Sequence, residues 1–381
     1  MKIRLLRAYN GDAIHLRTED EEEGRFINIL IDGGKGNTYS FKNSKKKDED
    51  GDLKVLIENI RSRDEHIDLL VLTHIDDDHI GGILKWIEKD GDAKDLIKKV
   101  WFNSGRLISE HFDEKETEEN LLNIKIQESN NTSVRQGVTF EDFIEDNNIW
   151  DRRIIKSKDE IDLFGLKFTI LSPSDEKLQL LLKNWEKEVP IFDTSKENDY
   201  SRSLSELIDS DLFKEDASVP NGSCIAFLIE KQGKKILFLG DAHPQVIINS
   251  LIDLGYSEQN PLEVNYVKLS HHGSKSNTNI ELLKLIRSEK YLISSNGDSH
   301  QLPDKRCLAR IIKTKEKVNF YFNYPELISK IFTEQDYESF PNFTTEEAPE
   351  EIELISKVIN EQDSDNEILT DNSAAKAPEE I

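Results

Sequence analysis

Residues 73–82 read Thr-His-Ile-Asp-Asp-Asp-His-Ile-Gly-Gly, which places two histidines and three aspartates within six positions. They directly follow the apolar run 67–72, Ile-Asp-Leu-Leu-Val-Leu, which predicts a short buried strand. The two glycines mark where the chain turns into the next element. Ligand-type side chains gathered at the end of a buried strand predict a metal site on a rigid edge of the fold. The alternative interpretation is a solvated acidic loop with two histidines in it, because acidic runs are abundant in this chain.

The composition suggests a folded body followed by an acidic tail. A chain of 381 residues can form one large domain or two smaller ones. Its hydrophobic content of 36% is low for a globular protein, and its charged content of 33% is high. Residues 333–381 contain 15 acidic and two basic side chains, so they carry −13 of the net charge of −25. We therefore predict a domain at 1–332 and an acidic, largely disordered tail at 333–381 that solvates the protein or docks a protein partner.

The chain has the features of a soluble cytoplasmic protein. Cys224 and Cys307 form neither a ligand-type pair nor a disulfide framework, which favours a reducing compartment. The first apolar run breaks at Asn10-Gly11, too early for a signal peptide, and no run approaches the roughly 20 apolar residues needed to cross a bilayer. We expect no membrane association.

Apolar runs and turn signals predict an early strand-rich section and then alternating strands and helices, which indicates α/β layers around sheets. Polar side chains follow several predicted strands, where α/β proteins usually place their sites. Residues 188–220 are polar and predict an insertion or flexible loop. We expect strands at 2–9, 12–18, 26–31, 67–72, 100–102, 166–171, 224–230, 235–239, 264–269 and 290–294, and helices near 53–61, 82–88, 106–150, 175–187, 244–254 and 279–287.

Seven short segments follow one another in a fixed order along the chain. They are 10–14 (Asn-Gly-Asp-Ala-Ile), 29–34 (Ile-Leu-Ile-Asp-Gly-Gly), 73–82, 170–173 (Ile-Leu-Ser-Pro), 221–223 (Asn-Gly-Ser), 238–241 (Phe-Leu-Gly-Asp) and 268–275 (Lys-Leu-Ser-His-His-Gly-Ser-Lys). Together they resemble the metallo-β-lactamase superfamily, and within it the hydrolase domain fused to bacterial competence (DNA-uptake, ComEC-type) membrane proteins. The resemblance implies an α/β fold, a four-layered αβ/βα sandwich with the metals at one edge of two sheets.

The resemblance also implies a centre of two divalent ions, Zn²⁺ or Mn²⁺ with Mg²⁺ as a further candidate. His74 and Asp76 would bind one ion, and Asp78 and His79 the other. Asp241 would bridge the two ions and His272 would complete the second site, and Asp78 would also be a catalytic residue. Asp32 would orient a ligand histidine through its other ring nitrogen.

The sequence departs from the common superfamily motif at two positions. Asp76 stands where His-x-His-x-Asp-His has its second histidine, a departure shared with the competence-type branch. A carboxylate there makes the site harder and favours Mn²⁺ or Mg²⁺ relative to Zn²⁺. Asn221 stands where most members place a histidine before the hairpin that leads to Asp241, so Asn221 or Ser223 would supply a neutral oxygen or hold a water.

The roles of the paired histidines remain open. Adjacent side chains of an extended chain point in opposite directions, so we do not expect both to bind the same ion. We favour His272 as the ligand and His271 as a neighbour or proton donor.

Three further residues near the end of the motif region have two interpretations each. Ser274 and Lys275 form either a phosphate cradle or a helix cap after a turn. His300 contacts a phosphate or leaving group, or is an ordinary loop residue.

These features predict a metal-dependent hydrolase that cleaves a phosphodiester with a metal-activated water. The dense basic run 42–47 is followed at once by acidic residues, and the chain lacks the basic stripe of a duplex-binding protein. The substrate is therefore left between nucleic acid and a small molecule. The alternative function is a non-catalytic or partner-activated metal-binding module in a multi-protein system such as phage defence.

Overall fold

The computed structural model describes residues 1–112, 132–185, 198–298 and 300–354, which form two sheets that face each other. The first sheet has the order β18-β1-β2-β3-β6-β7 and is antiparallel from β18 to β3 and parallel from β3 to β7. Its strands are β1 (Lys2–Leu5), β2 (Ile14–Asp20), β3 (Arg25–Ile31), β6 (Leu69–Val71), β7 (Val100–Trp101) and β18 (Ile352–Glu353).

The second sheet is larger and has the order β17-β16-β15-β13-β11-β10-β9-β8. Strands β11 to β17 are parallel neighbours, whereas β8 to β11 are antiparallel. The strands are β8 (Glu160–Leu163), β9 (Leu166–Ser172), β10 (Ala226–Lys231), β11 (Lys234–Phe238), β13 (Tyr266–Lys268), β15 (Lys290–Ile293), β16 (Val318–Phe322) and β17 (Phe343–Glu347).

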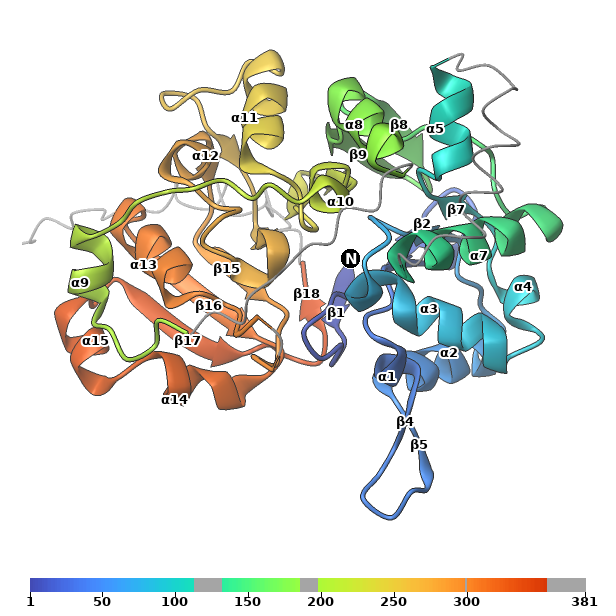
Figure 1. Cartoon of the computed structure of the whole chain (residues 1–381), viewed down its shortest axis with the longest axis horizontal. Coiled ribbons are helices and arrows are strands. Elements are labelled where there is room, and N and C mark those ends of the chain that lie inside the picture. Colours follow the sequence, from blue (N-terminus) through green and yellow to red (C-terminus); the bar gives the residue numbers. More distant parts are fainter. Residues whose placement is uncertain (113–131, 186–197, 299, 355–381) are drawn as a thin grey trace, which may run out of the picture.

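Apolar side chains of the two sheets meet in a shared core, for example Ile29 and Ile31 with Phe168 and Phe227. Helices cover the outer face of each sheet and form a separate hydrophobic core with it, so the molecule has four layers (Figure 1). The helices on the first sheet are α1 (Gly36–Tyr39), α2 (Asp52–Ser62), α3 (Asp77–Lys89), α4 (Ala93–Leu96), α5 (Gly105–His111), α7 (Thr132–Asp146) and α8 (Asp175–Trp185). Those on the second are α9 (Leu204–Asp209), α11 (Pro244–Asp253), α12 (Ile280–Leu285), α13 (Lys305–Thr314), η2 (Pro325–Leu327), α14 (Ile328–Ile331) and α15 (Glu334–Ser339).

This arrangement confirms the predicted α/β class and the four-layered αβ/βα sandwich. The remaining elements are short: α10 (Val219–Gly222), the 3₁₀ turn η1 (Ser270–Gly273), the strand pair β12 (Leu262–Glu263) with β14 (Ile286–Arg287), and the projecting hairpin β4 (Ser40–Lys42) with β5 (Asp48–Asp50). Among the described residues, no helix is both long and apolar enough to span a membrane.

The predicted start of the tail at residue 333 is wrong, because residues 333–354 are part of the folded body. β17 pairs with β16, and β18 pairs with β1, so this segment adds an edge strand to each sheet. Phe343 and Ile352 are buried although acidic residues surround them in the sequence. The edge position explains the composition, since only one face of an edge strand contacts the core and the other carries charge. Residues 355–381 lie outside the described residues.

Several other helices and strands also differ from the predicted ones. Helix α3 begins at Asp77 rather than near residue 82, so the end of the histidine–aspartate motif is helical. Elements β8, β16 and α13 had not been predicted. The described part of the predicted insertion, 198–220, contains α9 and the start of α10 rather than only loop.

Candidate metal centre

Four chain segments deliver the candidate ligands to one edge of the two sheets. The histidine–aspartate motif follows β6, and Asp32 follows the parallel neighbour β3. Asp241 follows β11, and the paired histidines follow its parallel neighbour β13. Because the carboxyl ends of parallel strands meet at one edge, residues far apart in sequence become neighbours.

The first turn of α3 fixes the orientation of the motif. Asp76 is the N-cap residue, and the backbone N–H of His79 donates to its carbonyl oxygen at 2.9 Å. Asp77 and Asp78 lie in the first turn, where negative charge interacts favourably with the helix dipole. His79 and Asp78 therefore project from helix, whereas His74 projects from the loop before it.

Four histidines present their Nε2 atoms to the carboxylate of Asp241. His79 Nε2 and His272 Nε2 lie 3.4 Å and 3.8 Å from Oδ1. His74 Nε2 and His271 Nε2 lie 3.7 Å and 3.8 Å from Oδ2. The carboxylate is thus flanked by one pair of imidazoles on each of its oxygens.

The Nδ1 atoms of the motif histidines are held through Asp32 and Thr73. His79 Nδ1 donates to Asp32 Oδ2 at 2.8 Å, and Thr73 Oγ1 donates to the same oxygen at 2.7 Å. The Thr73 hydroxyl can then accept from His74 Nδ1, which lies 3.1 Å away. With hydrogen on both Nδ1 atoms, the two Nε2 atoms carry lone pairs directed at the centre.

The paired histidines are held in the same way. His272 Nδ1 donates to the carbonyl oxygen of Ser294 at 3.0 Å. His271 Nδ1 lies 3.1 Å from the amide oxygen of Asn277, to which it can donate. Their Nε2 atoms are then also free to bind a cation.

The paired histidines do not have the extended backbone that the sequence analysis assumed. His271 and His272 both adopt left-handed conformations, with φ of 46° and 54°. This backbone turns both side chains toward Asp241, so the premise of an extended chain, from which His271 was expected to be a neighbour or proton donor, is wrong. Non-glycine residues rarely adopt this conformation, and consecutive cases are typical of functional sites.

The two remaining carboxylates of the motif lie at opposite sides of the centre. Asp76 Oδ2 is 3.6 Å from His74 Nε2, and Asp78 Oδ2 is 3.6 Å from His272 Nε2. Asn10, which had not been predicted as a site residue, donates from its amide to Asp78 Oδ2 at 2.9 Å. The neighbouring Gly11 is required, because a Cβ there would lie 1.9 Å from the carbonyl oxygen of Asp78.

Several buried ligand atoms of the centre lack any hydrogen-bond partner, namely Nε2 of His74, His79 and His272 and Oδ1 of Asp241. Unpaired buried polar atoms are costly, so their convergence is the arrangement expected of a cation site. His74, His79 and Asp241 offer three ligand atoms within 4.8 Å of one another, and so do Asp78, His79 and His272. The residues present therefore fit divalent ions.

The electrostatics agree with this geometry. Burial acts to lower the pKa of His79, but the charges of Asp241 and Asp32 raise it well above its usual value. Burial acts to raise the pKa of Asp241, but the neighbouring histidines His271 and His79 lower it far below its usual value. The cluster thus favours positive charge at its centre, which divalent cations provide.

Asn221 lies beside His271, and its amide nitrogen faces Asp216 and the His271 ring. Nδ2 donates to Asp216 Oδ2 at 2.7 Å and lies 3.4 Å from His271 Nδ1. Its Oδ1 is buried without a partner, so the predicted neutral oxygen is available. Asp216 had not been predicted, because its polar segment has no periodic pattern.

The two residues proposed as a phosphate cradle, Ser274 and Lys275, contact other residues of the chain. Lys275 Nζ is ion-paired with Asp304 at 2.6 Å, and the Lys275 backbone N–H donates to the same carboxylate. Ser274 Oγ accepts from the backbone N–H of Ser276 at 3.2 Å, a bond within the turn, and the next helix, α12, is capped by Asn279 instead. His300 is exposed in the loop before α13 and belongs to none of the acid–histidine groups among the described residues.

A second missed network lies beneath the centre. Lys268 Nζ donates to Asp12 Oδ2 at 2.6 Å, and both side chains are buried. Asp12 Oδ1 in turn lies 3.4 Å from His272 Nδ1. Both residues fall in segments that carried the family resemblance, but nothing in the sequence indicated that they pair.

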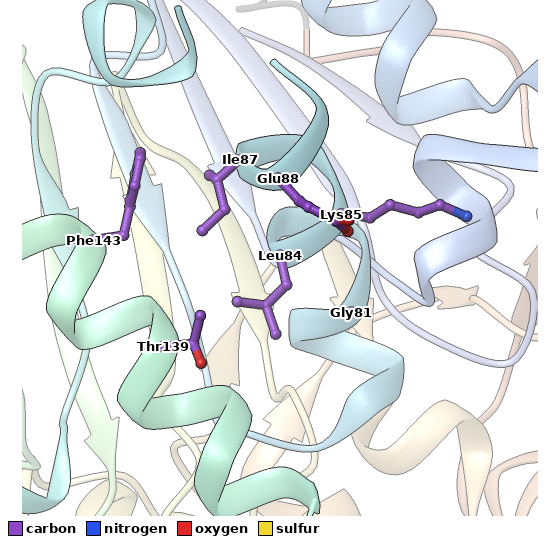
Figure 2. Close-up of a pocket in the computed structure, with 7 residues that line it drawn as sticks. All are labelled: Gly81, Leu84, Lys85, Ile87, Glu88, Thr139 and Phe143. Atoms are coloured by element: carbon purple, nitrogen blue, oxygen red, sulfur yellow. The ribbon is translucent and has the colours of Figure 1, made fainter. Parts of the chain in front are cut away.

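A groove lies between α3 and α7, two of the helices that cover the first sheet (Figure 2). Its lining includes Leu84, Ile87 and Phe143 and none of the metal-centre residues. The apolar lining distinguishes it from the polar centre.

Comparisons with known proteins agree with the fold. The family model described as the metallo-beta-lactamase superfamily matches residues 27–295. No curated protein sequence matches the chain.

Solved structures give matches of low identity. Zn²⁺-bound PqqB from Methylobacterium extorquens has 10% identity and a TM-score of 0.42, with 93% of this chain and 100% of that chain covered. The metallo-beta-lactamase fold protein YhfI from Bacillus subtilis has 9% identity and a TM-score of 0.38, with 92% and 98% covered.

Proposed function

Because the chain belongs to the metallo-β-lactamase superfamily, we propose that it is a metal-dependent hydrolase that cleaves a phosphodiester at a centre of two divalent ions. The observation that carries this proposal is the convergence of four histidine Nε2 atoms on the two oxygens of Asp241. A carboxylate flanked in this way is suited to bridge two cations.

The proposed ligand sets are alike on the two sides. One ion would be held by the Oδ2 side of Asp241 with His74, Asp76 and His271, and the other by the Oδ1 side with Asp78, His79 and His272. His271 thereby supplies the imidazole that the chain lacks at Asn221. The left-handed backbone of the paired histidines supports this assignment, since it lets neighbouring residues face different oxygens of Asp241.

The charges of the proposed centre suit an anionic substrate. Two divalent cations and the three carboxylates Asp76, Asp78 and Asp241 leave one net positive charge. When bound, such ions lower the pKa of a water and stabilise the attacking and leaving oxygens of a phosphodiester. Barriers of phosphoryl transfer are mainly a matter of positioning and charge, which this centre provides.

The chain's own residues have distinct parts in this proposal. Asp76 and His271 are partly exposed, at 31% and 26% of their side chains, so they border the open side where substrate would enter. His74 and His79 are fully buried and keep solvent from the inner side. Asn10 and Asp32 hold the ligands Asp78 and His79 in place through the hydrogen bonds given above.

The finer assignments rest on particular residues. Asp76 in place of a histidine supports Mn²⁺ as well as Zn²⁺ at the first site and supports a relationship to the competence-type branch. The acidic composition supports a small phosphodiester or single-stranded nucleic acid rather than a duplex. We further propose a cytoplasmic location and a protein partner for the acidic residues that end the chain.

The test is metal analysis together with turnover. Protein loaded with Mn²⁺ or Zn²⁺ is expected to contain two ions per chain and to hydrolyse bis-p-nitrophenyl phosphate or single-stranded DNA. The variant Asp78→Ala/His79→Ala is expected to lose turnover and one ion. Asp77→Asn is the matched control, because Asp77 lies in the same helical turn but accepts from Gln136 outside the centre.

The outcomes separate the candidate functions. Two bound ions without turnover of any phosphodiester would contradict the catalytic proposal and favour the partner-activated module. Absence of bound metal at neutral pH would contradict the centre itself.

A further inference from the structure

The polar segment 198–218, here called the strap, connects the outer helices of the second sheet to the metal centre. Figure 1 shows it running from α9, at the left edge of the view, to α10 near the middle. Building on the proposed function, we propose that the strap supplies a positioning residue, Asp216, whose carboxylate orients His271 as a ligand of the first ion.

Asp216 is mostly buried and occupies the space behind His271. Its Oδ2 lies 3.5 Å from His271 Nδ1 and accepts from Asn221 Nδ2 at 2.7 Å and from Asn277 Nδ2 at 3.1 Å. Its Oδ1 accepts from the backbone N–H of Ser218 at 2.8 Å. The carboxylate is therefore held on both oxygens, with His271 as its neighbour on the side of the centre.

Asn277 links Asp216 to the bridging carboxylate. This fully buried side chain donates to Asp216 and to the carbonyl oxygen of Asp241, the latter at 3.1 Å, while its Oδ1 faces His271 Nδ1. A hydrogen on His271 Nδ1 then has the amide oxygen of Asn277 as its acceptor at 3.1 Å, with the negative charge of Asp216 Oδ2 3.5 Å away. This fixes the ring with Nε2 toward Asp241 and makes that nitrogen a stronger ligand.

Under this assignment, each side of Asp241 has a ligand histidine that is supported by a further carboxylate. Asp32 supports His79, which faces Asp241 Oδ1, and Asp216 would support His271, which faces Asp241 Oδ2. Carboxylates in this position set both the orientation and the basicity of a ligand histidine.

His243 closes the other side of Asp216. Lys177 Nζ lies 2.9 Å from His243 Nδ1 and can donate to it, which leaves the hydrogen of the neutral ring on Nε2. That Nε2 has no hydrogen-bond partner and lies 3.9 Å from Asp216 Oδ2. Asp216 is thus enclosed between two histidines, one of which faces the centre.

Hydrogen bonds and an ion pair, in addition to apolar packing, fix the strap to α13 on the second sheet. The carboxylate of Asp199 accepts from the backbone N–H groups of Lys305 and Arg306 at 2.8 Å and 3.0 Å, at the start of α13. Asp211 forms a two-point ion pair with Arg310 at 2.7 Å and 2.8 Å. These contacts place Asp216 on a rigid support, which a positioning residue requires.

The test is a calorimetric titration of Mn²⁺ or Zn²⁺ into chelator-treated protein. Wild type is expected to show two binding steps. Asp216→Asn is expected to weaken one of them by about 10–100-fold and to leave the other unchanged. Glu215→Gln is the matched control, because it removes the same charge one residue away, and its oxygen can still accept from the Gln245 backbone.

A second variant guards against misfolding of the first. If Asp216→Asn does not fold, Asp211→Asn, which loosens the strap without touching the centre, is expected to weaken the same step.

If a folded Asp216→Asn protein binds both ions with wild-type affinities, the inference is overturned and the proposed function still stands. Loss of both steps together would also overturn it, since a positioning role for His271 concerns one ion. If wild type binds two ions but turns over no phosphodiester, the proposed activity fails and the affinity comparison still decides the role of Asp216. A wild type that binds no metal would overturn both proposals.

Discussion

Single hydrogen bonds decide which ring nitrogen of each histidine faces Asp241. Thr73, Asp32, Ser294 and Asn277 accept from or face the Nδ1 atoms, so each Nε2 is left for the centre. The candidate ligands are recognisable in the sequence, but these partners are scattered along the chain.

The support of His79 by Asp32 gives a prediction at this scale. Asp32→Asn removes the negative charge at His79 Nδ1 and disturbs the bonds from Thr73, so metal affinity or turnover should fall by about 10–100-fold. Metal titration and initial rates measure the effect.

Asp64→Asn is a matched control for that substitution. Asp64 is exposed and has the same left-handed backbone as Asp32, with φ of 55° against 57°. Equal losses in both variants would assign the effect to the backbone rather than to the contact with His79.

Among the elements, α3 depends on close approach to the end of β3. The backbone N–H of Gly82 donates to Gly34 at 2.7 Å, and a Cβ on Gly82 would lie 1.9 Å from the carbonyl oxygen of Gly33. The glycines that mark the turn in the sequence thus allow helix and strand to touch.

Gly82→Ala should therefore destabilise the protein by about 3 kcal/mol and displace the first turn of α3. Gly91→Ala, where a Cβ would meet nothing within 4 Å, should change the stability by less than about 0.5 kcal/mol. Urea denaturation midpoints compare the two variants, and similar midpoints would refute the close-approach argument.

The contact between α7 and α5 contains one buried ionisable group, the Glu141 carboxyl. Ser104, the N-cap residue of α5, donates to Glu141 Oε1 at 2.5 Å, and burial raises the pKa of Glu141 to about 7. An unfolded glutamate has a pKa of about 4.3, so between these values the native state binds more protons than the unfolded state. This group's contribution therefore favours the native state at low pH and is lost as pH rises through about 7.

Glu141→Gln cannot ionise and retains an oxygen for Ser104. It should be more stable than wild type at pH 8, by about 1–3 kcal/mol, and closer to wild type at pH 5. Thermal unfolding of both proteins at the two pH values measures this, and parallel pH dependences would show that Glu141 does not titrate as described.

Over the whole molecule, polar contacts join the two halves beneath the metal centre. The buried pair Asp12 and Lys268 connects residues 256 positions apart. Ser294 Oγ donates to the carbonyl oxygen of Gly11 at 2.7 Å, and Asn323 Nδ2 donates to that of Leu6 at 2.9 Å. These contacts thus fix the first and second sheets relative to each other close to the site.

Removal of one partner of the buried pair should be costly. Lys268→Met leaves the Asp12 carboxylate buried without its cation, and the free energy of unfolding should fall by about 3–5 kcal/mol. The double variant Lys268→Met/Asp12→Asn should recover part of that loss, because no unpaired charge remains. A double variant less stable than Lys268→Met would contradict the charge argument, as measured by urea unfolding.

Local patterns predicted much of the fold. Alternating or continuous apolar runs identified the hairpin of β10 and β11 and the buried strand β6, because these residues pack on a core at the period of a strand. The same patterns failed at β17 and β18, where edge strands carry acidic residues. They failed at the strap as well, since its position comes from side-chain bonds that leave no periodicity.

By itself, the sequence determined the α/β class, the resemblance, and the cluster that contains His74, Asp78 and His79, because motif spacing and strand patterns are local properties. Only the tertiary structure decided that His271 and His272 face different oxygens of Asp241, and that Asp216 and Asn10 belong to the neighbourhood of the centre. These facts depend on backbone conformation and on contacts between distant segments, which form when the two sheets pack together.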